Sequence, residues 1–322
     1  MRKSVLLVGE PMGLFMADSV GDLENVNSFS LSTCGAELNV AIGLKRLEHD
    51  VTYLTKLGDD LFGRRIIGSM RDNGISTDEI LYSDTHMTGF MFKSKVTTGD
   101  PAICYFRRNS AASTLAAKDM ETLDFSKFDM IHLTGITPAL SASARAASAV
   151  LNEKSRKAGC FFSFDPNLRP QLWPSQEEMA ACINSIAYRS DLFLPGIKEA
   201  ALLIGVEAPE KIAAHYISRG TKAVVVKLGT RGAYYARENG ASGYVDGFRV
   251  ERVVDTVGAG DGFAAGVLSA LREGQTFSQA VRRGCAVGAI QVMSRGDNDG
   301  LPSRAELDAF MAGQKDWRRQ SA

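Results

Sequence analysis

Residues 37–74 read ELNVAIGLKRLEHDVTYLTKLGDDLFGRRIIGSMRDNG, with a strand-like run at 51–58 between two patterns of helical apolar spacing. An apolar run typical of a buried strand, SVLLVG at 4–9, comes before them. Strand-like runs that alternate with helical patterns are typical of βαβ units, in which helices connect parallel strands. This part of the chain therefore predicts an α/β protein.

The same alternation continues in the second half of the chain. Strand-like runs there are FDMIHLTG (128–135), CFFSFDPN (160–167), DLFLPG (191–196) and AVVVKLG (223–229), and helical patterns lie between them at 139–158, 176–188 and 209–219. AVVVKL is apolar on both faces, as expected for a strand that helices cover on both sides. We predict a doubly wound, mostly parallel sheet.

Two segments, 11–33 and 87–107, interrupt this alternation. They contain short alternating runs, GFMFKSKV and AICYFRR among them, which predict antiparallel ribbons. We expect the ribbons to form a small β-sheet lid, while 1–10, 34–86 and 108–322 form the α/β core. Ordinary surface hairpins are the alternative interpretation.

The chain has 322 residues, with 37 Lys plus Arg and 37 Asp plus Glu, so its formal net charge is zero. This balance gives no indication of nucleic acid or an anionic membrane as a partner. No apolar stretch approaches the roughly 18 residues of a membrane helix, and we expect a cytoplasmic protein. Five cysteines without CxxC spacing and four histidines without a ligand pattern argue against disulfides and a structural zinc.

DTVGAGD at 255–261 places small residues and a carboxylate where a helix begins. FRVERVVDTV (248–257) predicts a strand and DGFAAGVLSALREG (261–274) a helix, so VGAGD is predicted to be a strand-to-helix turn. There, Gly258, Ala259 and Gly260 let an anion approach unpaired backbone N–H groups, which suits a phosphate. Asp261 is then best explained as a base that takes a proton from an attacking hydroxyl.

A plain helix cap is the alternative for Asp261, since aspartate is favoured at helix N-termini. Two other phosphate-binding loops are excluded. The chain has no Gly-Lys dipeptide and hence no GxxxxGK[ST] loop, and GAGDGF has Phe263 where a Rossmann fingerprint needs its third glycine.

DTVGAGDGFAAGVLSAL (255–271) and CGAELNVAIGLKRLEHDVTYLTKLGDDLFG (34–63) resemble the two signatures of the ribokinase-like (PfkB) sugar kinases, in the correct order. The resemblance covers nearly the whole chain. It implies a ribokinase-like fold and transfer of the γ-phosphoryl group of ATP, with Mg²⁺, to a hydroxyl of a sugar or nucleoside. It also implies that Asp261 is the general base and that Gly258, Ala259 and Gly260 form the anion hole.

In the first signature, Gly35, Ala36 and Asn39 match positions at which the family contacts sugar hydroxyls. A tight turn with a helix cap is the alternative for Ala36. Cys34 stands where the family usually has a second glycine, and a small residue is thereby kept.

KLGTRGAYY (227–235) resembles the family's strand and glycine turn beside the nucleotide. The candidates that this implies are Lys227, Gly229, Gly232 and Thr230, the last as a phosphate hydrogen-bond donor. A plain β-hairpin turn explains the glycines equally. In LPGIKEA (194–200), similar to the family's NxxE element, Glu199 is implied to organise Mg²⁺ through water, although Gly196 replaces the asparagine. A solvated helix carboxylate is the alternative for Glu199.

CAVGAIQVMSRGDNDGLPSRAEL (285–307) resembles the helix and loop that line the family's adenine pocket. Ala286, Ala289 and Gly296 are small enough to admit a flat base, although helix packing explains small residues as well. In many relatives this region carries a monovalent-cation loop near Asp255 and Thr256, which implies K⁺ as a possible further cofactor.

YFRRNSA (105–111) and FDPNLRPQLW (164–173) resemble the 2-keto-3-deoxygluconate kinase branch of the family. This implies that Arg107 and Arg169 face the substrate and that Tyr105 contacts it from the lid. The resemblance also implies that Phe90 lies on the substrate side, at a position where that branch often has a tyrosine, so that one hydroxyl contact is absent. Guanidinium groups suit the carboxylate of an aldonic acid, whereas a surface ion pair is the alternative for both arginines.

Asp165 and Asn167, in the same loop as Arg169, are candidates to position that arginine or a phosphate-bound water. The features together predict an ATP-dependent kinase for the terminal hydroxyl of 2-keto-3-deoxygluconate. A fructokinase, another sugar or nucleoside kinase of the family, and a non-catalytic sugar-acid sensor are the alternatives. Open edges and half-apolar faces of the lid ribbons predict a homodimer or higher homo-oligomer through the lid.

Overall fold

The computed structural model describes residues 3–97, 99 and 101–320, with side chains up to Gln314. Its largest element is a nine-stranded sheet in the order β13-β12-β11-β10-β9-β8-β1-β4-β5. The strands are β1 (Ser4–Val8), β4 (Val51–Gly58), β5 (Ser76–Ser83), β8 (Phe128–Thr134), β9 (Phe161–Asp165), β10 (Leu192–Phe193), β11 (Ala223–Lys227), β12 (Ala233–Arg237) and β13 (Ser242–Val245).

The strands from β5 to β11 pair in parallel, and β12 and β13 extend the sheet antiparallel at one edge. Strand β1 shows why both faces are apolar, because Val5 and Leu7 pack on one side while Leu6 and Val8 pack on the other. The predicted doubly wound, mostly parallel sheet is confirmed.

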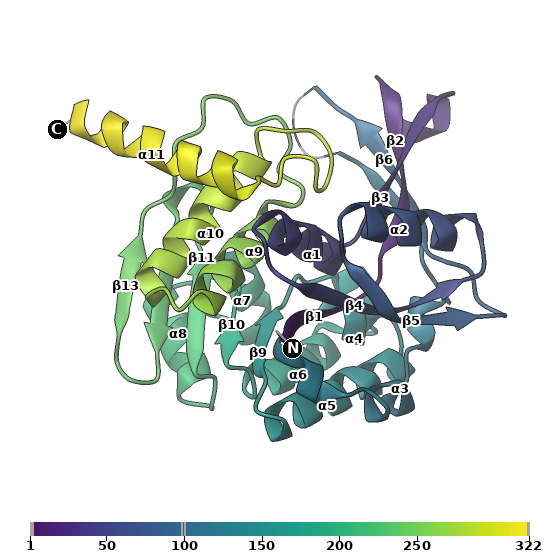
Figure 1. Cartoon of the computed structure of the whole chain (residues 1–322), viewed down its shortest axis with the longest axis horizontal. Coiled ribbons are helices and arrows are strands. Elements are labelled where there is room, and N and C mark those ends of the chain that lie inside the picture. The colour runs from purple at the N-terminus through teal and green to yellow at the C-terminus, as the bar shows by residue number, and fades with distance from the viewer. Residues whose placement is uncertain (1–2, 98, 100, 321–322) are drawn as a thin grey trace.

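Helices cover both faces of this sheet (Figure 1). One face carries α1 (Ala36–Arg46), α2 (Leu61–Asp72), α9 (Ala259–Arg272), α10 (Phe277–Gln291) and α11 (Arg304–Gln320). The other carries α3 (Ala117–Glu121), α4 (Ile136–Ala139), α5 (Ala142–Lys157), α6 (Gln176–Ala187), α7 (Ile197–Ile204) and α8 (Pro209–Ile217). Within the described residues, none of the helices has the length and apolar character needed to cross a membrane.

A smaller sheet, here called the lid sheet, has the order β3-β2-β6-β7. Its strands are β2 (Met12–Val20), β3 (Phe29–Cys34), β6 (Phe90–Lys95) and β7 (Ile103–Phe106). The pairs β2/β3 and β6/β7 are antiparallel, and β2 and β6 join them in parallel. The lid sheet projects from the large sheet beside α1 and α2 (Figure 1), so the second part of the predicted fold class is also confirmed.

The segment 246–257 is irregular, and the strand predicted for FRVERVVDTV is therefore wrong. The last strand ends at Val245, after which the chain packs on helices. Val254 N–H donates to the carbonyl oxygen of Val292 (2.7 Å), and the ring of Phe248 lies 5.4 Å from that of Phe310. Charged residues separate the apolar ones in this run, so it lacks the continuous apolar face of a sheet strand. The DTVGAGD turn thus connects a loop to α9.

Candidate active site

A cavity of about 550 Å³ lies between the lid sheet and the carboxyl ends of the parallel strands. Glu10, Ile136 and Asn167, which follow β1, β8 and β9, line it from the large sheet. Ligands of open α/β sheets bind at this edge. Many of the predicted site residues line this cavity: Gly35, Ala36, Asn39, Tyr105, Arg107, Arg169, Glu199, Lys227, Gly258, Gly260 and Asp261.

Asp261 lies in the first turn of α9 and is held by two side-chain amides. Its Oδ2 accepts a hydrogen bond from Asn39 Nδ2 (2.8 Å), and its Oδ1 accepts one from Asn167 Nδ2 (3.3 Å). Burial raises the pKa of the Asp261 carboxyl to about 7, and the hydrogen bond from Asn39 opposes this rise. The N-cap position is occupied by Gly258, which disfavours the plain cap as the explanation of Asp261.

The turn before Asp261 has the geometry that an anion-binding backbone requires. Gly258 has φ +79°, and a Cβ there would lie 2.1 Å from the carbonyl oxygen of Asp297, so no other residue fits. The hydrogen bond from Gly262 N–H to Gly258 C=O (2.8 Å) begins the helix, and the N–H groups of Gly260 and Asp261 precede it. These two N–H groups and the helix dipole favour an anion at this point.

Lys227 adds a positive charge beside this turn. Its Nζ lies 3.8 Å from the position that a Cβ of Gly260 would take, and 2.7 Å from Asp165 Oδ2. Burial acts to lower the pKa of Lys227, but Asp165 and Glu199 outweigh it, so the pKa lies above its usual value and the ammonium stays charged. Asp165 thus fixes Lys227 rather than Arg169.

Glu199 lines the cavity and also accepts hydrogen bonds from two backbone N–H groups. Its Oε2 accepts from Gly196 N–H (2.7 Å) at the start of α7, and its Oε1 accepts from Leu168 N–H (3.1 Å). Burial raises the pKa of the carboxyl, and Lys227 opposes this. The solvated-carboxylate alternative is therefore disfavoured.

The cavity residues suit Mg²⁺ only if water molecules of its hydration shell lie between the ion and the protein. Each oxygen of Glu199 already accepts one N–H, which leaves lone pairs for a metal-bound water. In the described part of the chain, no group of three or more His, Cys, Asp or Glu is placed to hold a metal ion. Mg²⁺ bound mainly by substrate phosphates and water, with one or two protein carboxylates, agrees with this arrangement.

The two predicted arginines differ in their partners. Arg107, with a side chain 5% exposed, forms a buried ion pair with Glu10, so the surface-pair alternative is wrong for it. Arg169 is half-buried and donates from Nη1 to the carbonyl oxygens of Asn167 (3.2 Å) and Leu168 (2.9 Å). Among the described residues Arg169 forms no ion pair with a carboxylate, although its charge acts to lower the pKa of Asp261. Its guanidinium is thus available to an anionic ligand in the cavity.

Phe90 does not face the cavity, and the substrate-side position predicted for it is wrong. Side chains alternate along β6, so Met91 lines the cavity while Phe90 and Phe92 lie on the opposite face of the lid sheet. The Phe90 ring stacks on Phe106 (centroids 4.8 Å apart) and on Phe62 of α2 (5.2 Å).

The predicted nucleotide residues lie outside the cavity, apart from Lys227. Gly229 and Thr230 are exposed in the turn between β11 and β12, an antiparallel pair as the hairpin alternative requires. A Cβ at Gly232 (φ +95°) would lie 2.0 Å from the carbonyl oxygen of Val245, so this glycine is needed for packing. Ala286 is completely buried in the core and Ala289 half-buried, which favours helix packing for Ala286. Ala259, the first residue of α9, shapes the turn without lining the cavity.

Two charged residues of the cavity were missed in the sequence. Glu10, only 2% exposed, pairs with Arg107 and accepts a hydrogen bond from Ser110 Oγ. A carboxylate directly after the apolar run of β1 was the available signal. Asp297 lines the cavity from the loop after α10, where no local pattern distinguishes it from its acidic neighbours.

Residues 2–304 match the model of the pfkB family carbohydrate kinases. A 2-dehydro-3-deoxygluconokinase from Bacillus subtilis is 43% identical over 316 residues, which cover 98% of this chain and 97% of that protein.

Solved structures with the same fold include a PfkB protein from Polaromonas sp., 44% identical, with a TM-score of 0.87 and coverage of 96% of this chain and 100% of that one. A fructokinase double mutant from Vibrio cholerae, solved with fructose, ADP and potassium ion, is 25% identical (TM-score 0.85, 96% and 98% covered). A putative ribokinase II from E. coli, in complex with ATP and Mg²⁺, is 24% identical (TM-score 0.86, 97% and 100% covered) and adds to the evidence for the fold.

Proposed function

The chain belongs to the pfkB family of carbohydrate kinases, and we propose that it transfers the γ-phosphoryl group of ATP to the terminal hydroxyl of 2-keto-3-deoxygluconate. This acceptor is the same compound as the 2-dehydro-3-deoxygluconate in the name of the Bacillus subtilis relative. The observation that carries the proposal is the placement of Arg169 in the cavity that contains Asp261.

Arg169 favours an acidic acceptor because no carboxylate in the described part of the chain forms an ion pair with it, although the more distant charge of Asp261 acts on it. A half-buried guanidinium gains more from a carboxylate than from a neutral hydroxyl, because charge-assisted hydrogen bonds are the stronger ones. Arg107 contributes less charge, since Glu10 already neutralises it. Arg169 thus binds the carboxylate, and Arg107 and Tyr105 line the lid side of the sugar.

Asp261 supplies the base for this reaction. A pKa of about 7 leaves a substantial ionised fraction at neutral pH and keeps the carboxylate basic enough to accept a proton. As the acceptor oxygen bonds to the γ-phosphorus, its proton passes to Asp261, and the bond from phosphorus to the oxygen shared with the β-phosphate breaks to release ADP. Asn39 and Asn167 orient the carboxylate for this step.

The phosphoryl group is proposed to lie at the start of α9. The N–H groups of Gly260 and Asp261 and the ammonium of Lys227 surround this point, so negative charge on the transferring group meets fixed donors. Gly35 and Ala36 border the sugar at the start of α1, where the Gly35 φ of +144° permits the close turn.

The nucleotide is proposed to extend from the α9 turn toward the β11–β12 hairpin, past Gly229 and Thr230 and toward Ala289. Mg²⁺, when bound with ATP, supplies charge that neutralises the β- and γ-phosphates. Glu199 is the residue proposed to hold its water shell, since its carboxylate lines the cavity near Lys227 (3.9 Å).

The test is ADP release from purified protein with Mg²⁺-ATP and a panel of acceptors that includes 2-keto-3-deoxygluconate, gluconate, fructose and a nucleoside. The expected result is a kcat/KM for 2-keto-3-deoxygluconate at least tenfold above that for fructose. A higher kcat/KM for fructose would favour the second candidate, a fructokinase, which the fructose-bound Vibrio cholerae relative suggests. Binding of the acid without ADP release would instead indicate a sensor.

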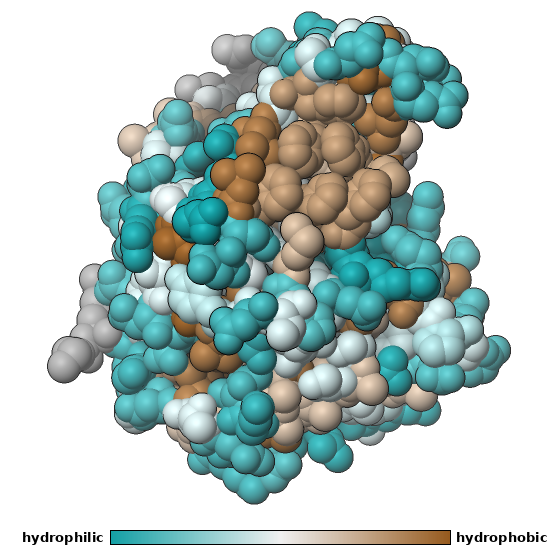
Figure 2. All heavy atoms as spheres, turned by 90° about the vertical axis from the view of Figure 1, so that its right-hand side faces the viewer, coloured by the Kyte–Doolittle hydropathy of each residue, from teal (hydrophilic) through white to brown (hydrophobic). Residues whose placement is uncertain are grey.

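We further propose that two chains associate through the outer face of the lid sheet. Figure 2 shows a continuous apolar area on this side of the molecule. The rings that pack together there belong to Phe15, Phe29, Phe62, Phe90, Phe92 and Phe106. Phe106 is 50% exposed, and an apolar area of this kind beside open strand edges is typical of a subunit interface.

Light scattering at micromolar concentration tests this association. The expected mass is at least twice the 34.7 kDa of one chain, and Phe106→Ser should lower it. A single-chain mass for the unaltered protein would contradict the lid interface.

A further inference from the structure

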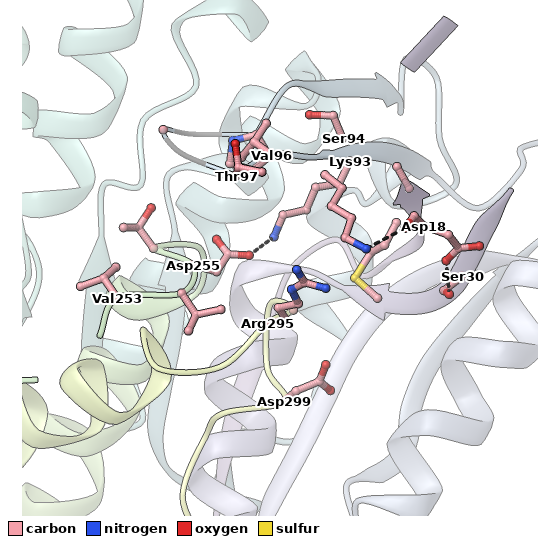
Figure 3. Close-up of a pocket in the computed structure, with 18 residues that line it drawn as sticks. Asp18, Ser30, Lys93, Ser94, Val96, Thr97, Val253, Asp255, Arg295 and Asp299 are labelled. Atoms are coloured by element: carbon pink, nitrogen blue, oxygen red, sulfur yellow. Dashed lines mark hydrogen bonds and ion pairs between the residues drawn. The ribbon is translucent and has the colours of Figure 1, made fainter. Parts of the chain in front are cut away.

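Lys93 reaches from the lid sheet into the α/β core. It lies on β6, its side chain is 6% exposed, and its Nζ lies 2.7 Å from Asp255 Oδ2 and 3.0 Å from Asp297 Oδ1. Figure 3 shows the lysine extending from the lid strand to Asp255, at one side of a cavity of about 410 Å³. Lys95, two residues further along the strand, instead donates to the carbonyl oxygen of Asp18 within the lid.

Both carboxylates that Lys93 contacts are largely buried and need a cation. Burial raises the pKa of Asp297, and Lys93 opposes this rise. Burial also acts to lower the pKa of Lys93, but Asp297 and Asp255 outweigh it, so the ammonium remains charged. A buried carboxylate whose partner is removed is strongly destabilising, so these three groups depend on one another.

The two carboxylates belong to the backbone around the anion hole. Asp255 Oδ1 accepts a hydrogen bond from Val257 N–H (3.0 Å), directly before Gly258. The carbonyl of Asp297 lies where only a glycine at position 258 leaves room for it. The next residue, Asn298, donates to Asn39 Oδ1 (3.0 Å), and Asn39 in turn donates to Asp261. Lys93 therefore holds both loops that shape the turn and orient the base.

A monovalent cation, which the family resemblance implied near Asp255 and Thr256, does not fit this arrangement. Asp255 Oδ2 already accepts a hydrogen bond from the ammonium of Lys93 (2.7 Å), which carries the positive charge that a monovalent cation would bring. The cation would have to displace a lysine that is held by two carboxylates at once.

We propose that Lys93 supplies, from the lid sheet, the fixed positive charge that holds the loops around the anion hole, so that catalysis by this chain requires no K⁺. Lys93 is a positioning residue, since it touches the turn through Asp255 and Asp297 and lines no part of the cavity that contains Asp261. The proposal rests on the kinase function. It also ties the position of the lid to the shape of the anion hole, because withdrawal of β6 would leave two buried carboxylates without their cation.

The experiment measures ADP release in tetramethylammonium, Na⁺, K⁺ and NH₄⁺ chlorides at equal ionic strength, with saturating Mg²⁺-ATP and acceptor. It compares the unaltered chain, Lys93→Met, Lys93→Arg and the matched control Lys95→Met. The unaltered chain, Lys93→Arg and Lys95→Met should vary less than threefold among the cations. Lys93→Met should lose at least tenfold in kcat in tetramethylammonium and recover at least threefold in K⁺ or NH₄⁺, which replace the missing ammonium.

Melting temperature in the same four salts gives a readout that does not need turnover. K⁺ or NH₄⁺ should raise the melting temperature of Lys93→Met relative to tetramethylammonium, and should leave that of Lys95→Met unchanged. Activation of the unaltered chain by K⁺ of threefold or more would overturn the proposal, and this result needs no variant to fold. A kcat of Lys93→Met equal to that of Lys95→Met would overturn it as well. Failure of every acceptor would count against the proposed function, and the melting series would still decide the role of Lys93.

Discussion

The side-chain amide of Asn39 donates a 2.8 Å hydrogen bond to Oδ2 of Asp261, although 222 positions separate the two residues in the chain. Asn39 lies on α1 and Asp261 on α9, so this bond joins the amino-terminal and carboxyl-terminal signatures. Asn298 Nδ2 donates to Oδ1 of the same asparagine (3.0 Å). Because its oxygen is held in this way, Asn39 presents its NH₂ group to Asp261 and fixes one carboxylate oxygen.

Asp261→Asn should lower kcat by about 10²–10⁴-fold, the range typical of a lost general base. Asparagine has the same shape, and its amide oxygen can still accept the hydrogen bond from Asn39, so only the longer bond from Asn167 (3.3 Å) is lost. The fold and the affinity for ATP should therefore persist. Stopped-flow or coupled measurement of ADP release gives kcat, and circular dichroism with calorimetric titration of ATP provides the control. A kcat within tenfold of the unaltered chain would contradict the base assignment.

The pH dependence should report Asp261 directly. Only the ionised carboxylate accepts a proton, so kcat/KM should rise with pH to a plateau above a midpoint near the pKa of about 7. Stability should change in the opposite direction. The folded pKa lies above the ordinary value of 3.8, so the folded state binds this proton more tightly than the unfolded state, and that stabilisation is lost as pH rises through 7.

Asp261→Asn has no titrating group at this position. Its free energy of unfolding therefore lacks the pH dependence that Asp261 contributes, and it serves as the comparison. In urea unfolding at pH 5 and pH 8, the free energy of unfolding of the asparagine variant relative to the unaltered chain should be higher at pH 8. If the free energies of unfolding of the two proteins differed by the same amount at pH 5 and at pH 8, Asp261 would have no raised pKa in the folded state.

Asn39→Ala should move the midpoint of the kcat/KM profile upward. The hydrogen bond from Asn39 favours the charged carboxylate and lowers the pKa of Asp261, so its removal leaves the effect of burial less opposed. Profiles of kcat/KM between pH 5.5 and 9 test this. An unshifted midpoint with an unchanged plateau would mean that Asn39 does not act on Asp261.

The local pattern of the sequence predicted the features that depend on neighbouring residues. Runs such as 223–229 alternate with helical patterns, and this periodicity is enough to indicate a sheet covered on both faces. Gly258 and Asp261 lie three residues apart, so the sequence also indicated that both lie where one helix begins. In contrast, the apolar residues of 248–257 predicted a strand, because their contacts with α10 and α11 are set by tertiary packing.

Contacts between residues that lie far apart in the sequence could not be predicted from local patterns. The family resemblance gave the approximate position of Phe90 in the lid. Successive side chains of a strand point to opposite faces of the sheet, so a shift of one residue along β6 decides whether a side chain faces the cavity. Glu10 and Arg107 are 97 positions apart, so nothing local to Arg107 shows that its charge is neutralised. The same holds for Lys93, whose carboxylate partners lie in the carboxyl-terminal third of the chain.

Arg169→Ala should raise the KM for 2-keto-3-deoxygluconate by about 10–100-fold, as expected for the loss of a hydrogen bond to a charged group worth about 1.5–3 kcal/mol. The KM for fructose should change less than threefold, because a neutral sugar does not use the charge. Arg108→Ala is the matched control, since Arg108 is exposed and lies outside the cavity. An equal rise in KM for both acceptors would contradict the carboxylate contact.

The two glycines of the proposed anion hole, Gly258 and Gly260, should respond differently to the same added methyl group. Gly258→Ala should lower the free energy of unfolding by more than about 2 kcal/mol, because alanine is strained at φ +79° and its Cβ would lie 2.1 Å from the carbonyl oxygen of Asp297. At Gly260 φ lies outside the left-handed region, and the nearest atom to an added Cβ is Lys227 Nζ at 3.8 Å. Gly260→Ala should therefore fold with nearly unchanged stability.

The cost at position 260 should appear in catalysis instead. A methyl group there faces Lys227, in the space proposed for the transferring phosphoryl group, and would hold that group away from the N–H donors of α9. We expect kcat to fall at least about tenfold, since donors of this kind act only at short range. Urea unfolding and ADP release, measured on both variants, separate the two effects. Full activity of Gly260→Ala would contradict the place proposed for the phosphoryl group beside Lys227.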